Sequence, residues 1–142
     1  MAPISKWQKR RDIAWPFLLA GTITLCSGFP AAVPVIKWLA PDKLGHFAAY
    51  GALATAMVRL PAMARWWLLG GWWTILLTSA YGLGDEVRQS FTIVRLFEWD
   101  DWVADTVGAA AAVTLYLRWA GYRRLLETPI LFKRAKPLAN QI

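Results

Sequence analysis

The sequence has little of the chemistry from which most metal centres and nucleophilic sites are built. Among its 142 residues there is one cysteine, Cys26, and one histidine, His46. A single cysteine excludes a disulfide framework and a cysteine-based metal site. One histidine with scattered carboxylates is only a weak signal for a metal, so we expect no bound metal and no cofactor.

Several familiar catalytic motifs are also absent. The chain has no glycine-rich phosphate-binding loop, no Gly-x-Ser-x-Gly elbow and no His-Glu-x-x-His pair. It has no internal repeat, whereas many membrane carriers are built from duplicated halves. A small transporter or channel is therefore the least favoured function class.

Charge is scarce and apolar residues are abundant. Only 18% of the residues are charged, 57% belong to the apolar set, and ten are tryptophan. This excess over the usual apolar share of about 45–50% excludes a disordered chain and disfavours a soluble globule. Four segments carry almost no charge, and each is long enough to cross a hydrocarbon layer about 30 Å thick. They are residues 13–29, 44–64, 66–84 and 102–120.

These segments predict an all-α, polytopic membrane protein with four transmembrane helices. The transmembrane domain covers residues 13–120, between a basic arm at residues 1–12 and a basic tail at residues 121–142. A basic arm followed by an apolar segment is also the pattern of a cleaved signal peptide, which is a rival interpretation of residues 13–29.

The distribution of the basic residues predicts an orientation. Lysine and arginine concentrate in the arm, in the connection between the second and third segments, and in the tail. By the positive-inside rule both termini then face the cytoplasm (N-in, C-in), with membrane lipids as partners. The formal net charge of +7 is thus a topology signal, and we expect no nucleic-acid binding.

The polar residues gather at the segment ends that this orientation places on the outer side. Asp42, His46 and Tyr50 recur every four residues and therefore share one helix face. Ionisable groups near lipid are costly unless they are paired or wetted, so their clustering indicates function. The candidate site consists of Asp42, Lys43, His46, Glu86, Gln89, Arg95, Asp101 and Asp105.

Each candidate has a chemical role that its side chain can perform. His46 beside carboxylates suits a general acid/base, oriented by Asp42 or Glu86, and these three are the candidate catalytic residues. Lys43 and Arg95 carry the charge to hold a phosphate or carboxylate. The candidate binding residues are Lys43, Gln89, Arg95, Asp101 and Asp105.

The same charges also have plainer interpretations. A charge at the end of a span is commonly an anchor at the membrane interface, and Asp42 is a typical helix N-cap. Asp101 and Asp105 can pair with Arg95 and tie helices together without any ligand.

Two further expectations concern the last segment. Gly108 and Ala112 continue the helix face of Asp105, and such small residues let another helix approach closely. Glu98 and Asp100 are expected to be solvated loop charges.

The candidate residues resemble the motifs of a known family, the VanZ-like membrane proteins. Its first motif is Asp-Lys-x-x-His-Phe at the start of a span. Its second motif is an acidic residue followed by Glu-x-x-Gln at the end of the next span. Its third motif has four positions in order: Arg, Asp, a residue that is either Asn or Asp, and Gly. The matching residues are Asp42, Lys43, His46 and Phe47; Asp85, Glu86 and Gln89; and Arg95, Asp101, Asp105 and Gly108. The resemblance covers roughly residues 40–110, with Asp at position 105 making the site more acidic than Asn would.

The resemblance implies a small, multi-pass helical protein of the bacterial inner membrane but no particular reaction. The family is named for a protein linked to low-level resistance to teicoplanin, a lipoglycopeptide. The leading hypothesis is an outer-face polar pocket that binds, or acts on, the head group of a lipid or amphiphile. The alternative is a non-catalytic accessory or assembly subunit of a larger membrane complex, such as a respiratory or photosynthetic one.

Overall fold

A computed structural model describes residues 6–27, 41–91 and 97–128. Within these ranges the secondary structure is helical, without a strand, which confirms the all-α prediction. Predictions that concern Arg95, residues 1–5 and residues 129–142 lie outside the described residues. The helices are α1 (Lys6–Ser27), α2 (Pro41–Val58), α3 (Pro61–Ala64), α4 (Trp67–Ser90), α5 (Trp99–Arg118) and α6 (Ala120–Glu127).

The helices α1, α2, α4 and α5 all extend beyond the predicted apolar segments, and the extensions carry polar residues. α1 begins at Lys6, so part of the predicted basic arm is helical. α2 already begins at Pro41, because proline fits the first helical turn and the carboxylate of Asp42 is favourable near the positive end of the helix dipole. α4 continues to Ser90 and carries Asp85 and Glu86 on its last turns. The extensions of α2 and α4 lie at the same end of the molecule.

The second predicted segment is not one helix. α2 ends at Val58 and the short α3 begins at Pro61, because proline lacks an amide hydrogen and its ring clashes with a preceding helical turn. Over the described ranges, no helix is both long enough and apolar enough to cross a membrane. The four transmembrane spans therefore stay a prediction.

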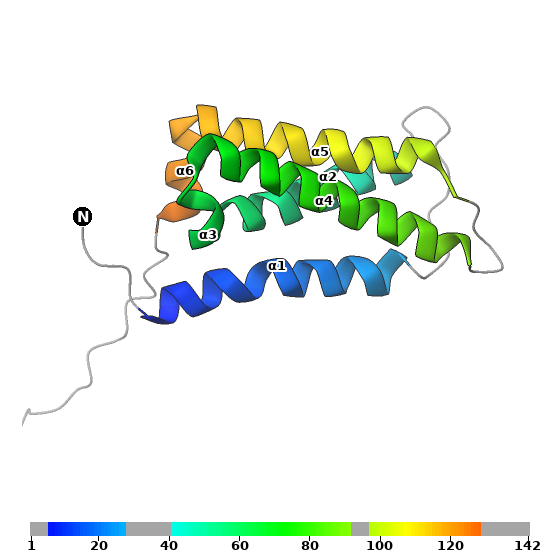
Figure 1. Cartoon of the computed structure of the whole chain (residues 1–142), viewed down its shortest axis with the longest axis horizontal. Helices are drawn as coiled ribbons and strands as arrows, with labels where there is room; N and C mark the ends of the chain where they lie inside the picture. Colours follow the sequence, from blue (N-terminus) through cyan, green and yellow to red (C-terminus); the bar gives the residue numbers. More distant parts are fainter. Residues whose placement is uncertain (1–5, 28–40, 92–96, 129–142) are drawn as a thin grey trace, which may run out of the picture.

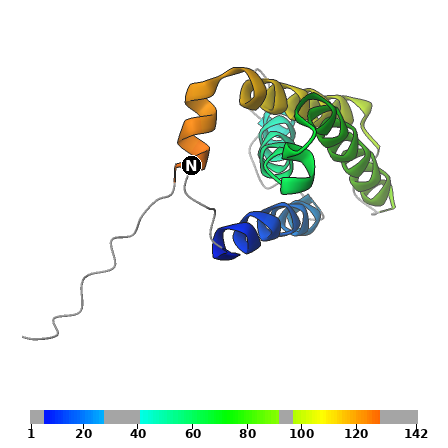
Figure 2. The ribbon, with the colours of Figure 1, turned by 60° about the vertical axis from the view of Figure 1, so that its left-hand side comes forward.

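The long helices run alongside one another (Figure 1). α2 and α5 share the largest interface, α4 packs against α5 and α2, and α1 lies along α2. α6 turns away from the direction of α5 at one end of the bundle (Figure 2). At the other end α2 and α5 begin and α4 ends.

The interior combines a small apolar core with polar side chains. The core contains Ala54, Val58, Ala109, Val113 and Tyr116. Buried polar residues are Thr55, Thr74, Thr78, Asp85, Glu86, Gln89, Asp101 and Asp105. Thr74 and Thr55 satisfy their hydroxyls by donating to the carbonyls of Gly70 and Gly51, one turn earlier, at 2.8 and 2.9 Å. A helical face that looks polar in the sequence can therefore still be an interior face.

The close approach of α2 and α5 depends on a glycine. A Cβ atom on Gly108 would collide with the backbone carbonyl of Phe47 in α2. One turn further, Ala112 lies against α2 at Gly51, whose own Cβ position would be 3.7 Å from that of Ala112. This contact confirms the small-residue face predicted for the last segment.

α1 is joined to α4 by hydrogen bonds. The hydroxyl of Tyr81 donates to the carbonyl of Ala20 at 2.7 Å and pairs with the Thr24 hydroxyl at 2.6 Å. About one turn further along α1, the hydroxyl of Ser27 accepts a hydrogen bond of 2.7 Å from Arg88 of α4. These bonds fix the position of α1 on the side of the bundle.

Tyr81→Phe is expected to loosen α1. The substitution keeps the ring but removes two hydrogen bonds, each with a net value of about 1 kcal/mol, so the unfolding free energy should fall by about 1–2 kcal/mol. Hydrogen exchange should speed up in the amides of α1. Tyr122→Phe is the matched control, because the Tyr122 hydroxyl contacts Thr55 on α2 and should leave α1 unchanged. Equal effects of the two variants on α1 would contradict the assignment.

Candidate functional site

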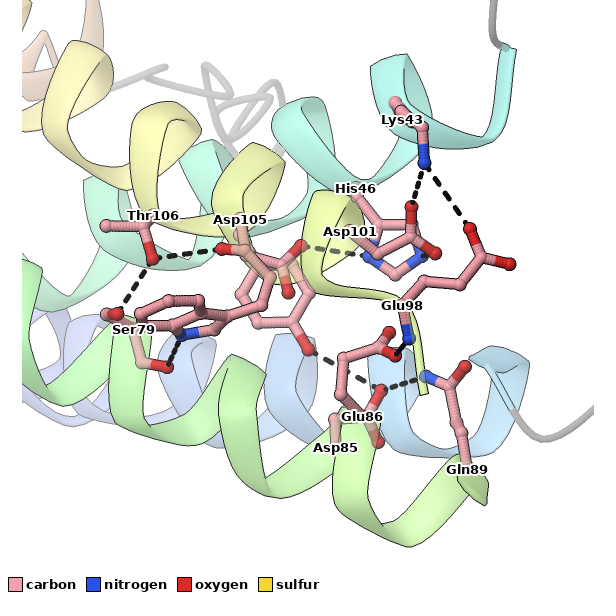
Figure 3. A network of polar contacts seen from close by, with 12 residues as sticks. Lys43, His46, Ser79, Asp85, Glu86, Gln89, Glu98, Asp101, Asp105 and Thr106 are labelled. Carbon is pink, nitrogen blue, oxygen red and sulfur yellow. Dashed lines mark hydrogen bonds and ion pairs between the residues drawn. The ribbon is translucent and has the colours of Figure 1, made fainter. Parts of the chain in front are cut away.

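Side chains from α2, α4 and α5 meet at the end of the bundle where α2 and α5 begin (Figure 3). The residues that meet there, called the polar cluster below, are Lys43, His46, Asp85, Glu86, Gln89, Asp101 and Asp105. All of them belong to the motifs quoted from the sequence, although they come from three helices. Asp42 is exposed at the edge of this cluster.

The two ring nitrogens of His46 face carboxylates of α5. Nδ1 lies 2.9 Å from Oδ1 of Asp105, and Nε2 lies 3.6 Å from Oδ2 of Asp101. The four-residue spacing of the two aspartates brings both to the face of α5 that packs on α2. The hydrogen-bond partner of His46 is thus Asp105, where the sequence suggested Asp42 or Glu86.

Asp105 fits between the helices because the facing residue of α4 has no side chain. A Cβ atom on Gly82 would lie only 2.7 Å from Oδ2 of Asp105 and 3.1 Å from the ring of Tyr50. The carboxyl of Asp105 is therefore completely buried. Its Oδ1 faces His46, and its Oδ2, which lies against Gly82, has no hydrogen-bond partner among the described residues.

Lys43 is surrounded by acidic side chains. Its Nζ donates to Oδ1 of Asp101 at 3.0 Å and to Oε2 of Glu98 at 3.4 Å, and it lies 3.9 Å from Oδ2 of Asp100. An anionic ligand at Lys43 would have to compete with these carboxylates. Sequence reasoning missed Glu98, because a charge in the loop before α5 has no helical spacing that would link it to Lys43.

Asp85 has hydrogen-bond donors on both carboxylate oxygens. Arg88 donates to Oδ1 from Nε at 3.0 Å and from Nη2 at 2.8 Å. Gln89 donates to Oδ2 at 2.9 Å, and the Tyr50 hydroxyl lies 3.5 Å from the same oxygen. The bonds from Arg88 and Gln89 fix the Asp85 carboxylate within α4, and the Tyr50 hydroxyl approaches it from α2.

Glu86 differs from its neighbour because it is only partly satisfied. Its side chain is 2% exposed, and Oε2 accepts a hydrogen bond from the backbone amide of Glu98 at 3.2 Å. Oε1 is buried and has no hydrogen-bond partner among the described residues. Burial raises the pKa of the Glu86 carboxyl; the Glu98 amide lowers this pKa, and the nearby Asp101 carboxylate raises it.

Two groups of side chains place potential metal ligands close together. His46, Glu86 and Asp101 each have a ligand atom within 4.8 Å of the others, and both carboxylates are buried. Asp42, Glu98 and Asp101 form a second group, in which the first two residues are exposed. The sequence alone indicated neither group, since their members come from different helices and a loop.

Fold and site together define a small all-helical protein with an acid-rich, largely buried cluster at one end of its bundle. The chain belongs to the VanZ/LLP1 family, which matches residues 7–121. This match confirms the resemblance seen in the motifs and includes the whole polar cluster. No curated protein and no solved structure is significantly similar to the chain.

Proposed function

We propose that this VanZ/LLP1 protein is a multi-pass, N-in/C-in protein of the bacterial inner membrane that binds the head group of a lipid or another amphiphile at the polar cluster. Two features support the proposal. The first is the apolar exterior of the bundle, and the second is an apolar groove next to the cluster.

The exterior of α4 is apolar while its interior face is polar. Leu68 and Trp72 are 67% and 65% exposed, whereas Thr74 and Thr78 are completely buried. Large exposed apolar areas are unfavourable in water and favour contact with lipid or with another protein. The mean hydropathy of α4 includes both its outward apolar face and its buried polar face. The outward face alone is therefore more apolar than the mean hydropathy of the helix.

The groove lies between α1, α2 and α5. It has a volume of about 620 Å³, and its walls include Leu19, Phe47, Ala52 and Leu115. Its walls are mostly apolar and its width is set by small residues of α2 and α5. These properties suit an acyl chain or a similar apolar tail.

A second hollow of about 460 Å³ adjoins the groove, and Phe47 lines both. The walls of this hollow include Lys43 and Asp100 as well as Val103. Polar and apolar walls therefore meet at Phe47, one residue from His46. This junction is the observation that carries the proposal, because it suits a molecule with a polar head and an apolar tail.

A role as an accessory subunit of a membrane complex is the second candidate. Three exposed tryptophans lie on the α4 side: Trp72 and Trp73 on α4, and Trp66 just before it. Tryptophan supplies a large, rigid contact area and is enriched in protein interfaces. These side chains therefore favour a protein partner on the α4 side, away from the groove.

One purification distinguishes these two functions. The native membrane is solubilised gently, the protein is separated by size, and whatever travels with it is identified by mass spectrometry. Head-group binding predicts a lone chain of 16.0 kDa that carries a specific lipid or lipid-linked sugar. A stoichiometric protein partner without such a lipid would favour the subunit role.

A substitution that fills the groove sharpens this test. Ala52→Trp should lower the amount of bound amphiphile about tenfold, which corresponds to about 1.4 kcal/mol of binding free energy. Ala80→Trp is the matched control, since Ala80 is exposed on α4 and does not line the groove. The same retention by both variants would exclude the groove as the binding site.

A further inference from the structure

We propose that the polar cluster contains a site for one divalent transition metal ion, with His46, Glu86 and Asp101 as protein ligands and Asp105 as the residue that orients His46. This proposal is independent of amphiphile binding. It departs from the sequence-based expectation of no metal.

The three ligands converge from three helices. His46 comes from α2, Glu86 from α4 and Asp101 from α5, and each has a ligand atom within 4.8 Å of the other two. Nε2 of His46 and Oδ2 of Asp101 are 3.6 Å apart. The edge of a tetrahedron with metal–ligand bonds of about 2.1 Å measures about 3.4 Å, so this separation fits a shared metal.

The unpartnered oxygen of Glu86 is the observation that points to a missing ligand. Glu86 is only 2% exposed, and its Oε1 has no hydrogen-bond partner among the described residues. A buried carboxylate oxygen without a partner is energetically costly. Figure 3 shows Glu86 extending from α4 toward His46 and Asp101, where a cation would satisfy the oxygen.

Asp105 favours the tautomer of His46 that can bind a metal through Nε2. Nδ1 of His46 lies 2.9 Å from Oδ1 of Asp105. An ionised carboxylate only accepts hydrogen bonds, so beside an ionised Asp105 a neutral imidazole carries its proton on Nδ1. The lone pair is then on Nε2, the nitrogen nearer to Asp101. A carboxylate behind a metal-bound histidine commonly fixes the tautomer and the ring orientation in this way.

The local charges also favour a cation. Arg88 pairs with Asp85 at 2.8 Å, and Lys43 pairs with Asp101 at 3.0 Å. No such basic side chain among the described residues pairs with Glu86. One nitrogen and two carboxylate ligands suit zinc, manganese or ferrous iron, and three protein ligands leave a position for water or another ligand.

The second acidic group is a weaker choice. Asp42 and Glu98 are exposed, and the Lys43 ammonium already lies 3.4 Å from Glu98 and 3.0 Å from Asp101. Lys43 thus pairs with two members of this group, whereas in the first group it pairs with Asp101 alone. Asp42 is therefore a suitable control position.

Zinc binding to the whole purified chain tests the proposal. The protein is prepared without a polyhistidine tag, treated with a chelator, and dialysed against zinc, and the bound zinc is measured by elemental analysis. We expect one equivalent of zinc per chain and a raised unfolding temperature. Glu86→Gln should weaken zinc binding at least about tenfold, as loss of a ligand does, while Asp42→Asn should leave it unchanged.

The single histidine allows a test on the unmodified protein. With ¹⁵N-labelled histidine, His46 gives the imidazole signals of the chain without any substitution. One equivalent of zinc should shift the Nε2 resonance and leave the Nδ1 proton in place. Unchanged His46 resonances, or binding that Asp42→Asn removes and Glu86→Gln does not, would overturn the proposal.

Discussion

Gly108→Ala is expected to lower the free energy of unfolding by about 2–3 kcal/mol, because the added methyl group has no space. Its Cβ atom would collide with the backbone carbonyl of Phe47, and a backbone carbonyl cannot rotate away as a flexible side chain can. α2 and α5 would have to separate along the largest helix interface of the bundle. Thermal or chemical unfolding of the purified protein measures the change.

Gly45→Ala is the matched control for this prediction. Gly45 lies on α2, and a Cβ atom there meets nothing within 4 Å. Since alanine has a higher helix propensity than glycine by about 1 kcal/mol, this variant should be as stable as the wild type or more stable. If Gly108→Ala also stabilised the protein, α2 and α5 would not pack as closely as described.

Asp105→Ala is expected to cost on the order of 3 kcal/mol of folding free energy, since it removes one partner of a buried polar pair. Nδ1 of His46 would lose the acceptor that lies at 2.9 Å, and a cavity would open beside Gly82. The loss should appear as a lower unfolding temperature, together with an altered ring orientation of His46 in NMR spectra.

Asp105→Asn separates the negative charge of Asp105 from its hydrogen bond and packing. The amide has nearly the same shape, its oxygen still accepts from His46, and the family motif has Asn or Asp at this position. We therefore expect this variant to remain within about 1 kcal/mol of the wild type, the net value of one hydrogen bond. Equal destabilisation by Ala and Asn would show that the negative charge of Asp105, rather than its hydrogen bond, stabilises the cluster.

Much of the candidate site was predictable because its residues occur in short local patterns. The four-residue spacings of Asp42 with His46 and of Asp101 with Asp105 place side chains on one helix face wherever the helices pack. Glu86 and Gln89 were found in the same way, near the end of an apolar segment. The family match over residues 7–121 includes all of these residues.

The partners within the site were harder to predict. His46 pairs with Asp105 in place of Asp42, because α5 packs on α2 at that point. Lys43 pairs with Asp101 and with Glu98, which looked like a solvated loop charge. Such pairings depend on which helices become neighbours, and no local spacing encodes that choice.

The sequence by itself determined the all-helical class, the family, and the helix faces on which the polar residues lie, because these follow from periodicities and motifs of a few residues. Tertiary structure decided which faces meet, and thereby left one oxygen of Glu86 buried and unpartnered beside His46 and Asp101. It also determined the groove beside Phe47. Both results depend on contacts between residues far apart in the chain, which form only when helices pack.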